Sequence, residues 1–144
     1  MRFAVVISRY NREVTDGLFD GAREFLAEKG LEIRSEDVID APGAFEIPLI
    51  AQTAARTGRY AGVICLGSVT KGDTAHFEFI SLGAAIGIQQ ASLSTEVPIA
   101  FGILTTYTEE QAAVRANPGH ENKGREAANA CWSAARALAQ LRAL

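Results

Sequence analysis

The apolar positions of this chain fall into short continuous runs that alternate with stretches of helical spacing. Residues 3–7 and 62–66 are almost wholly apolar, which is typical of strands that are buried on both faces. In residues 14–26, apolar side chains instead recur every three or four positions. That spacing predicts an amphipathic helix, which Gly30 ends.

The whole chain follows this alternation. We expect strands at residues 3–7, 32–40, 62–66 and 98–104, and helices from about 14 to 29, 48 to 58 and 76 to 94, from 108, and after 122. The second strand is polar and is expected at a sheet edge. Thr108 and Gln111 fit a capping box at the fourth helix. The last helix is expected to have one apolar face, made of Ala127, Cys131, Ala134, Leu138 and Leu141.

Helical connections between successive strands require those strands to run parallel. The predicted fold class is therefore α/β, a three-layer α/β/α sandwich of flavodoxin-like type with a four-stranded parallel sheet and five helices. Residues 1–144 are expected to form one domain, because the chain has the length of an ordinary domain. In open parallel sheets, ligands bind beyond the carboxyl ends of the strands. The segments expected there are residues 8–11, 42–46, 67–76 and 105–107.

The richest of these segments is Gly67-Ser68-Val69-Thr70-Lys71-Gly72-Asp73-Thr74-Ala75-His76. A turn with two glycines, a hydroxyl group and backbone N–H groups at the start of a helix suits an anion. His76 can transfer protons beside that anion. The alternative interpretation is a histidine at a helix start that is satisfied by solvent.

The other candidate residues leave two interpretations open. Tyr10, between Arg9 and Asn11 at the end of the first strand, faces either a ligand or the core. Arg115 and Lys123 flank a connection that contains proline and glycine, and surface charges of this kind are usually only solvated. The sequence contains no G-x-G-x-x-G fingerprint for a nicotinamide cofactor and no glycine-flanked nucleophile of a hydrolase.

Charge and composition exclude further classes. The net charge is −3, without a basic stripe, which disfavours nucleic-acid binding. No signal sequence or membrane-spanning run is evident, so we expect a cytoplasmic protein. Metal binding is not expected, because His76 and His120 are far apart in sequence. Cys65 and Cys131 are interpreted as buried thiols rather than a disulfide.

Five segments together resemble the 6,7-dimethyl-8-ribityllumazine synthase family of riboflavin biosynthesis, in order and in spacing. They are Ser8-Arg9-Tyr10-Asn11, Pro42-Gly43-Ala44-Phe45-Glu46-Ile47-Pro48, Lys71-Gly72-Asp73-Thr74-Ala75-His76-Phe77, Pro98-Ile99-Ala100-Phe101-Gly102-Ile103-Leu104-Thr105-Thr106 and Asn122-Lys123-Gly124-Arg125-Glu126-Ala127-Ala128. The P-G-A-F-E-I-P and G-x-T-x-H-F patterns are highly specific in combination.

The resemblance implies condensation of 5-amino-6-(ribitylamino)uracil with 3,4-dihydroxy-2-butanone 4-phosphate, giving the lumazine, phosphate and water. It implies no cofactor and a functional link to riboflavin synthase. It also implies a homopentamer whose active sites lie between subunits, and it leaves open a 60-subunit shell.

The resemblance also implies a role for each matching residue. His76 is the implied general acid and base, Arg115 the phosphate clamp, and Lys123 a second cation. The implied substrate-binding residues are Tyr10, Asn11, Ala44, Phe45, Glu46, Ser68, Val69, Thr70, Asp73, Thr74, Phe101 and Arg115. Of these, Tyr10 stacks on the pyrimidine, residues 44–46 hold the ribityl chain, Asp73 and Thr74 cradle phosphate, and Phe101 comes from a neighbouring subunit.

The chain departs from the family pattern at two places. It has Thr70-Lys71 where the family commonly has Ile-Arg, and Leu82-Gly83 where the family often has Asn-Glu. Lysine replaces a bidentate arginine poorly if that side chain contacts phosphate. The alternative functions are a flavin- or lumazine-binding protein without turnover and a shell-forming protein of the same fold. A flavodoxin-like FMN carrier is disfavoured, because no Thr/Gly-rich loop follows the first strand.

Overall fold

The computed structural model describes residues 1–144, which form a four-stranded parallel sheet and five α-helices. The strands are β1 (Phe3–Ser8), β2 (Val38–Ala41), β3 (Gly62–Thr70) and β4 (Ile99–Thr106). The helices are α1 (Arg12–Glu28), α2 (Ile47–Arg56), α3 (His76–Thr95), α4 (Glu109–Arg115) and α5 (Lys123–Arg142). The strand order is β2-β1-β3-β4, so the predicted fold class is confirmed and the polar second strand lies at an edge.

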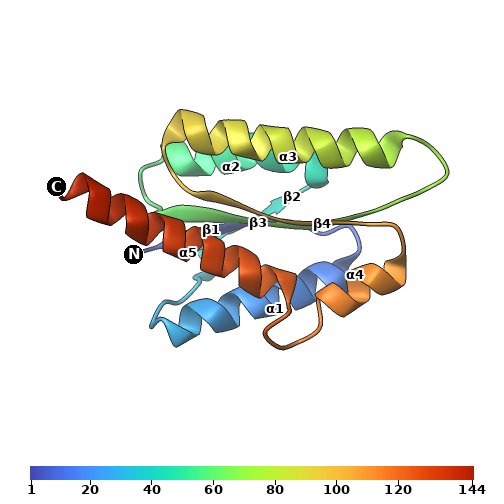
Figure 1. Ribbon diagram of the computed structural model, residues 1–144, viewed down its shortest axis with the longest axis horizontal. Helices are drawn as coiled ribbons and strands as arrows, with labels where there is room; N and C mark the ends of the chain where they lie inside the picture. Colours follow the sequence, from blue (N-terminus) through green and yellow to red (C-terminus); the bar gives the residue numbers. More distant parts are fainter.

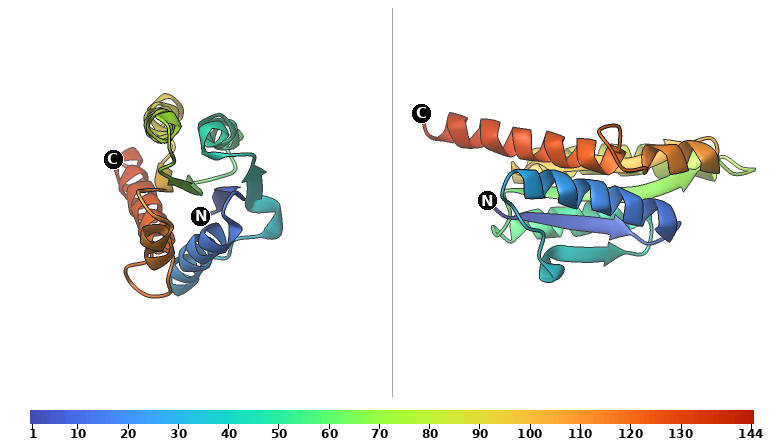
Figure 2. Two further views of the ribbon diagram at one scale, coloured as in Figure 1. Left: turned by 90° about the vertical axis from the view of Figure 1, so that its right-hand side faces the viewer. Right: turned by 90° about the horizontal axis from the view of Figure 1, so that it is seen from below.

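The helices cover both faces of the sheet in two pairs. Helices α2 and α3 pack together on one face, and α1 and α5 pack together on the other, with α4 beside α1 (Figures 1 and 2). Both chain ends lie at one end of the molecule, and the connection between β3 and α3 lies at the opposite end (Figure 1). The carboxyl ends of the strands point toward this connection.

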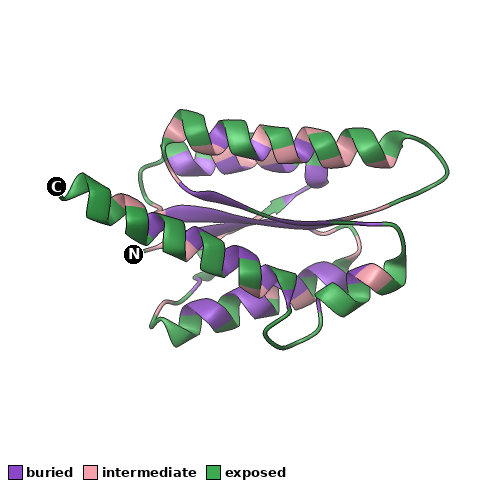
Figure 3. Cartoon of the chain, in the orientation of Figure 1, coloured by how far each residue is buried: buried purple, intermediate pink, exposed green.

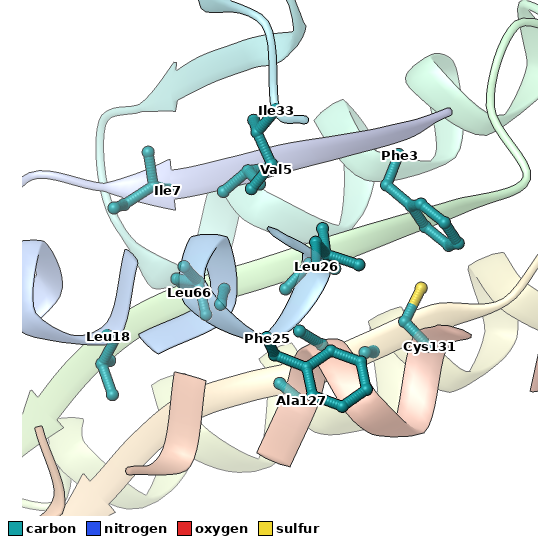
Figure 4. Packing of buried hydrophobic residues seen from close by; sticks show 14 of the residues in the cluster. Phe3, Val5, Ile7, Leu18, Phe25, Leu26, Ile33, Leu66, Ala127 and Cys131 are labelled. Atoms are coloured by element: carbon teal, nitrogen blue, oxygen red, sulfur yellow. The ribbon is translucent and has the colours of Figure 1, made fainter. Parts of the chain in front are cut away.

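Alternate side chains of the inner strands point to opposite faces of the sheet and belong to two separate hydrophobic cores. On β1, Phe3, Val5 and Ile7 join the core under α1 and α5 (Figure 4), whereas Ala4 and Val6 join the core under α2 and α3. Figure 3 shows the sheet as the buried layer between exposed outer helix faces. A strand that is buried on both sides needs apolar residues at every position, which explains the unbroken run at residues 3–7.

Three of the predicted strand boundaries are wrong. Strand β2 begins only at Val38, because residues 35–37 form a short 3-10 turn that buries the Asp37 carboxylate. Strands β3 and β4 both run further than predicted, to Thr70 and Thr106, which pair with each other. Mutual hydrogen bonding of the two strands extends the ladder beyond the apolar runs that mark them in the sequence.

The buried face of α5 also differs from the prediction. It consists of Gly124, Ala127, Ala128, Cys131 and Ala135. Ala134 and Leu141 are exposed, and Leu138 is half-buried. The last turns of α5 project beyond the sheet (Figure 1), so Leu141 has no core to join. Ala134 lies outside the buried face because α5 packs against α1 as well as against the sheet.

Both cysteines are free and buried, as expected. Burial raises the pKa of the Cys131 thiol to about 12 and also raises the pKa of Cys65. The Cys131 thiol lies 3.6 Å from the carbonyl oxygen of Val63. Both groups stay protonated and unreactive at neutral pH, because only the thiolate is a strong nucleophile.

Candidate functional site

A cavity of about 560 Å³ opens at the carboxyl end of the sheet. Its walls come from the ends of β1 and β3, the segment between β2 and α2, and the start of α3. It is lined by Ser8, Tyr10, Pro42, Gly43, Ala44, Phe45, Glu46, Ser68, Val69, Thr70, Gly72, Thr74, His76, Phe77 and Ile80. Three segments that are far apart in sequence therefore meet where a parallel sheet places its ligands.

Arg9 anchors the segment that carries Tyr10. Its Nε donates to Asp40 Oδ1 at 2.8 Å and its Nη1 donates to Asp16 Oδ1 at 2.9 Å, which joins the end of β1 to β2 and α1. Asn11 then adopts a left-handed backbone conformation, with φ of 59°, at the start of α1. The Tyr10 side chain remains 76% exposed, so its ring offers a flat face to a ligand rather than to the core.

The segment before α2 forms the next wall. Ala44–Glu46 is a 3-10 turn that leads into α2, whose first turn accommodates Pro48. The Phe45 ring lies over Gly83 of α3, where an added Cβ would come within 2.7 Å of Phe45 Cε1. Gly83 belongs to the Leu82-Gly83 pair, which departs from the expected pattern. Here it provides the space that this ring occupies.

The floor of the cavity is the extended end of β3. Ser68, Val69 and Thr70 pair with Leu104, Thr105 and Thr106 and so have fixed backbone positions. The Ser68 hydroxyl is buried and has no hydrogen-bond partner within the protein. Such a group carries a desolvation cost until a partner binds it, so it is suited to recognise a polar ligand edge.

The turn predicted at residues 67–76 is shorter than expected. Gly67 to Thr70 belong to β3, which leaves only residues 71–75 as the loop. The backbone N–H of His76 donates to Thr74 Oγ1 at 3.4 Å, and both residues line the cavity. The exposed start of α3 thus directs its positive dipole end and an imidazole toward the same space.

Lys71 lies beside the cavity without lining it. Its backbone N–H donates to the Thr106 carbonyl oxygen at 2.9 Å, and its Nζ lies 5.8 Å from the centre of the Tyr107 ring. The Tyr107 ring in turn lies 6.0 Å from that of Phe77. A single positive charge over an aromatic ring is a cation–π arrangement that lysine makes as well as arginine. In this arrangement Lys71 supports the loop.

A second hollow, of about 480 Å³, runs along the outer edge of β4. It is lined by residues 100–106, Arg115, Lys123, Glu126, Ala127 and Ala130. Arg115 Nη1 donates to the Gln111 carbonyl oxygen at 3.0 Å, and Lys123 Nζ lies 2.8 Å from Glu126 Oε2. The hollow shares no lining residue with the first cavity. Within one chain, Arg115, Lys123 and Phe101 are thus separated from His76.

The structure brings together most of the sequence-predicted residues. Tyr10, the 44–46 segment, the 68–70 segment, Thr74 and His76 line one cavity. Asn11 and Asp73 do not line it. The Asn11 amide donates to Glu109 Oε2 at 3.1 Å, and Asp73 lies on the exposed loop. Sequence reasoning missed Phe77 and Ile80, which also line the cavity. They follow His76 by one and four positions in the same helix, and this spacing could have indicated them. Sequence reasoning also missed Glu126, three residues after Lys123.

Two further features concern metal ions and membranes. No group of three or more His, Cys, Asp and Glu side chains is arranged to hold a metal ion. None of the helices has the combination of length and apolar character needed to cross a membrane.

Comparison with known proteins gives consistent matches. The family model described as 6,7-dimethyl-8-ribityllumazine synthase matches residues 1–139. A relative from Caulobacter vibrioides, named 6,7-dimethyl-8-ribityllumazine synthase 1, is 61% identical over 98% of this chain and 92% of its own length. Proteins named 6,7-dimethyl-8-ribityllumazine synthase from Salinibacter ruber and Deinococcus radiodurans are 48% and 45% identical, over 97% and 98% of this chain and 90% and 91% of theirs.

Proposed function

Since this chain belongs to the 6,7-dimethyl-8-ribityllumazine synthase family, we propose that it condenses 5-amino-6-(ribitylamino)uracil with 3,4-dihydroxy-2-butanone 4-phosphate. The products are 6,7-dimethyl-8-ribityllumazine, phosphate and water. The observation that carries the proposal is the cavity in which Tyr10, Glu46 and His76 converge at the carboxyl end of the sheet. Residues 1–144 act as one lumazine synthase domain.

In this proposal the pyrimidine occupies the main cavity. The exposed Tyr10 ring stacks on the heterocycle, and residues 68–70 contact its polar edge. The unpartnered Ser68 hydroxyl supports this arrangement, because a ring carbonyl or N–H would satisfy it. Residues 44–46 face the ribityl chain, with the Glu46 carboxylate accepting hydrogen bonds from its hydroxyls. Asn11 contributes through the position of the Tyr10 segment.

The phosphorylated ketone lies nearer the start of α3. Thr74 and the backbone of Asp73 hold its phosphate, and Arg115 and Lys123 neutralise the charge. Arginine is suited to this role because its guanidinium binds phosphate through two parallel hydrogen bonds. Release of phosphate develops negative charge on the leaving group, so fixed cations accelerate that step.

His76 transfers protons in the proposed mechanism. Attack of an amine on a ketone forms a carbinolamine that must lose water, and each step moves a proton to or from oxygen or nitrogen. An imidazole near neutral pH can both accept and donate that proton. The remaining rate enhancement comes from holding the two reactants side by side.

The direct test is an absorbance assay for the lumazine chromophore with both substrates, compared with the slow uncatalysed condensation. We expect acceleration that needs both substrates and that falls by about 10²-fold or more in His76→Ala, as for the loss of a general acid–base group. An unchanged rate in His76→Ala would remove this residue from the mechanism. Tight binding of a lumazine or flavin without acceleration would instead favour the non-catalytic binding protein. The absence of both binding and acceleration would favour the shell-forming protein.

Arg115→Ala provides a separate test of the phosphate half. We expect the KM for the phosphorylated ketone to rise by about tenfold or more, because one charged hydrogen-bonding partner is worth about 1.5–3 kcal/mol. The KM for the pyrimidine should change little. A loss of pyrimidine binding alone would contradict the assignment of Arg115.

We also propose that the active site forms between subunits of a homopentamer. Two observations support this. The cations and Phe101 line a hollow at the open edge of β4, apart from the His76 cavity, so a second copy is needed to unite them. In addition, α3 exposes the apolar side chains Phe79, Leu82, Ile86 and Leu93. Five subunits that pair through such edges close into a ring, and a 60-subunit shell is a further level of the same assembly.

Subunit complementation tests this assembly. His76→Ala and Arg115→Ala proteins are unfolded, mixed in equal amounts and refolded together. If each site takes His76 from one chain and Arg115 from the next, about a quarter of the sites in a randomly mixed ring regain both residues. The assay uses a ketone concentration well below the raised KM of Arg115→Ala, so that each separately refolded protein should show only its own low rate. No recovery in the mixture would place both residues in one chain's site.

The cytoplasm is the proposed compartment. The two buried free thiols are typical of a reducing environment. The expected substrates are small polar or phosphorylated metabolites, and riboflavin synthase is the expected consumer of the product.

A further inference from the structure

Asn122 has not yet been given a role in the reaction, but both the nitrogen and the oxygen of its side-chain amide have hydrogen-bond partners. It is 2% exposed and lies at the start of α5. Its Nδ2 lies within hydrogen-bond distance of three carbonyl oxygens, those of Gly17 at 3.1 Å, Ala116 at 3.0 Å and Asn117 at 3.0 Å. Its Oδ1 accepts from the Arg125 backbone N–H at 3.0 Å and so caps α5.

These contacts join three separate pieces of backbone. Ala116 directly follows Arg115 at the end of α4, and Lys123 directly follows Asn122 at the start of α5. Gly17 belongs to α1, which is held against the sheet core by Leu18. The Asn122 amide therefore fixes the two ends of the connection between the cations to each other and to a rigid helix.

The surface of α1 is shaped to receive this side chain. At Gly21, an added Cβ would overlap the Asn122 side-chain amide. At Gly124, the second residue of α5, an added Cβ would overlap the Leu18 carbonyl group. Any side chain at either position would push the start of α5 away from α1, and Lys123 with it.

The two cations themselves have only local, exposed partners. Arg115 contacts its own helix at Gln111, and Lys123 contacts Glu126 one turn further along α5. Neither contact sets the separation of the two side chains across the connection. That separation depends on the backbone, which Asn122 holds.

We propose that Asn122 is a positioning residue that fixes Arg115 and Lys123 as one phosphate-binding pair. This inference rests on the proposed function. Its physical basis is that binding a tetrahedral anion between two cations requires their backbones to be held within a fraction of an ångström, and a shift of 1 Å can cost about 10²-fold in rate. A buried side-chain amide with both ends in use supplies that rigidity.

The test variant is Asn122→Ser. Serine keeps the cap, since its hydroxyl can accept from the Arg125 N–H, but it cannot reach the three carbonyl oxygens. We expect the KM for the phosphorylated ketone to rise by about tenfold, as for a displaced charged contact, with the KM for the pyrimidine within about twofold. If this variant does not fold, Gly21→Ala, whose added Cβ would displace the Asn122 amide without removing it, is measured in the same way.

A control and a double-mutant cycle separate positioning from stability. Asp37→Asn should destabilise the amino end of the sheet without changing the ratio of the two KM values. In the Arg115→Ala background, Asn122→Ser should raise the ketone KM by only about twofold, because only Lys123 of the pair is then left to position. Equal effects of Asn122→Ser with and without Arg115, or an equal rise in both KM values, would overturn the inference.

Binding of inorganic phosphate, measured by calorimetry, distinguishes this inference from the proposed function. If the wild-type protein forms no lumazine, the proposed function fails whatever Asn122 does. Weaker phosphate binding in Asn122→Ser than in the wild type would still support the positioning of the cations. Equal phosphate binding in the two proteins would contradict it.

Discussion

At the scale of single residues, the strongest buried charge lies far from the cavity. The Asp37 carboxylate is 0% exposed and accepts hydrogen bonds from Arg2 Nε, Arg2 Nη2 and Tyr60 Oη, each at 2.8 Å. The hydrogen bonds from Arg2 lower the pKa of Asp37 by more than burial raises it, and the hydrogen bond from Tyr60 lowers the pKa further. These contacts join the starts of β1, β2 and β3.

We predict that Asp37→Asn lowers the free energy of unfolding by about 3 kcal/mol, because it leaves Arg2 without its buried charge partner. The sign of the pH dependence follows from the lowered pKa. In the wild type, the contribution of Asp37 is complete above the ordinary carboxyl pKa of about 4 and is lost as the pH falls toward its lower folded-state pKa. Urea unfolding across acid pH measures this, and the variant should lack that part of the acid sensitivity.

The matched control is Glu36→Gln, which removes the other carboxylate that contacts Arg2, at 3.0 Å. That side chain is exposed, so the change should cost about 1 kcal/mol or less. Equal losses in the two variants would show that burial does not strengthen the Asp37 interaction.

At the scale of elements, the short helix α4 depends on its cap. Thr108 Oγ1 accepts from the Gln111 backbone N–H at 3.1 Å, and Gln111 Oε1 accepts from the Tyr107 backbone N–H at 2.9 Å. The helix has seven residues and ends at Arg115. A helix of two turns has few internal hydrogen bonds, so its cap contributes a large share of its order.

We predict that Thr108→Ala lowers the free energy of unfolding by about 1 kcal/mol, the usual value of a lost side-chain cap. Because α4 carries Arg115, the same change should raise the KM for the phosphorylated ketone more than that for the pyrimidine. Urea unfolding and steady-state kinetics measure the two effects. Thr108→Ser keeps the hydroxyl and should behave as the wild type, so a deficit in the serine variant would argue against the cap.

At the scale of the whole molecule, α3 is apolar on two sides. Ala84, Ile88 and Ala91 pack on the sheet, and the outer face exposes Phe79, Leu82, Ile86 and Leu93. An exposed apolar stripe along a helix is typical of a surface that another chain covers. This stripe lies on the helix whose first residue is His76, so the proposed interface and the candidate site share one element.

We predict that Leu82→Glu reduces the oligomer to smaller species, because a buried unpaired carboxylate is costly at an apolar interface. Analytical ultracentrifugation measures the mass, and circular dichroism should show that the helices are retained. Leu144→Glu, which introduces the same charge at the fully exposed last residue, should leave the mass unchanged. An unaltered mass in Leu82→Glu would remove this stripe from the interface.

The sequence alone determined the alternation of strands and helices, the edge position of β2 and the capping box of α4. These features are local, since side-chain periodicity and turn chemistry act within a few residues. The motifs around Tyr10, residues 42–48 and His76 also predicted which segments meet, because the carboxyl ends of parallel strands share one edge.

Only the tertiary structure decided the remaining features. The extension of β3 to Thr70 depends on pairing with β4. The position of the Phe45 ring depends on the space at Gly83, which lies nearly forty residues further along the chain. The separation of Arg115 and Lys123 from His76 within one chain, and the contacts of Asn122 to α1, also join distant segments. Such contacts leave no periodic signal in the sequence, because they are fixed by the packing of whole elements rather than by neighbouring residues.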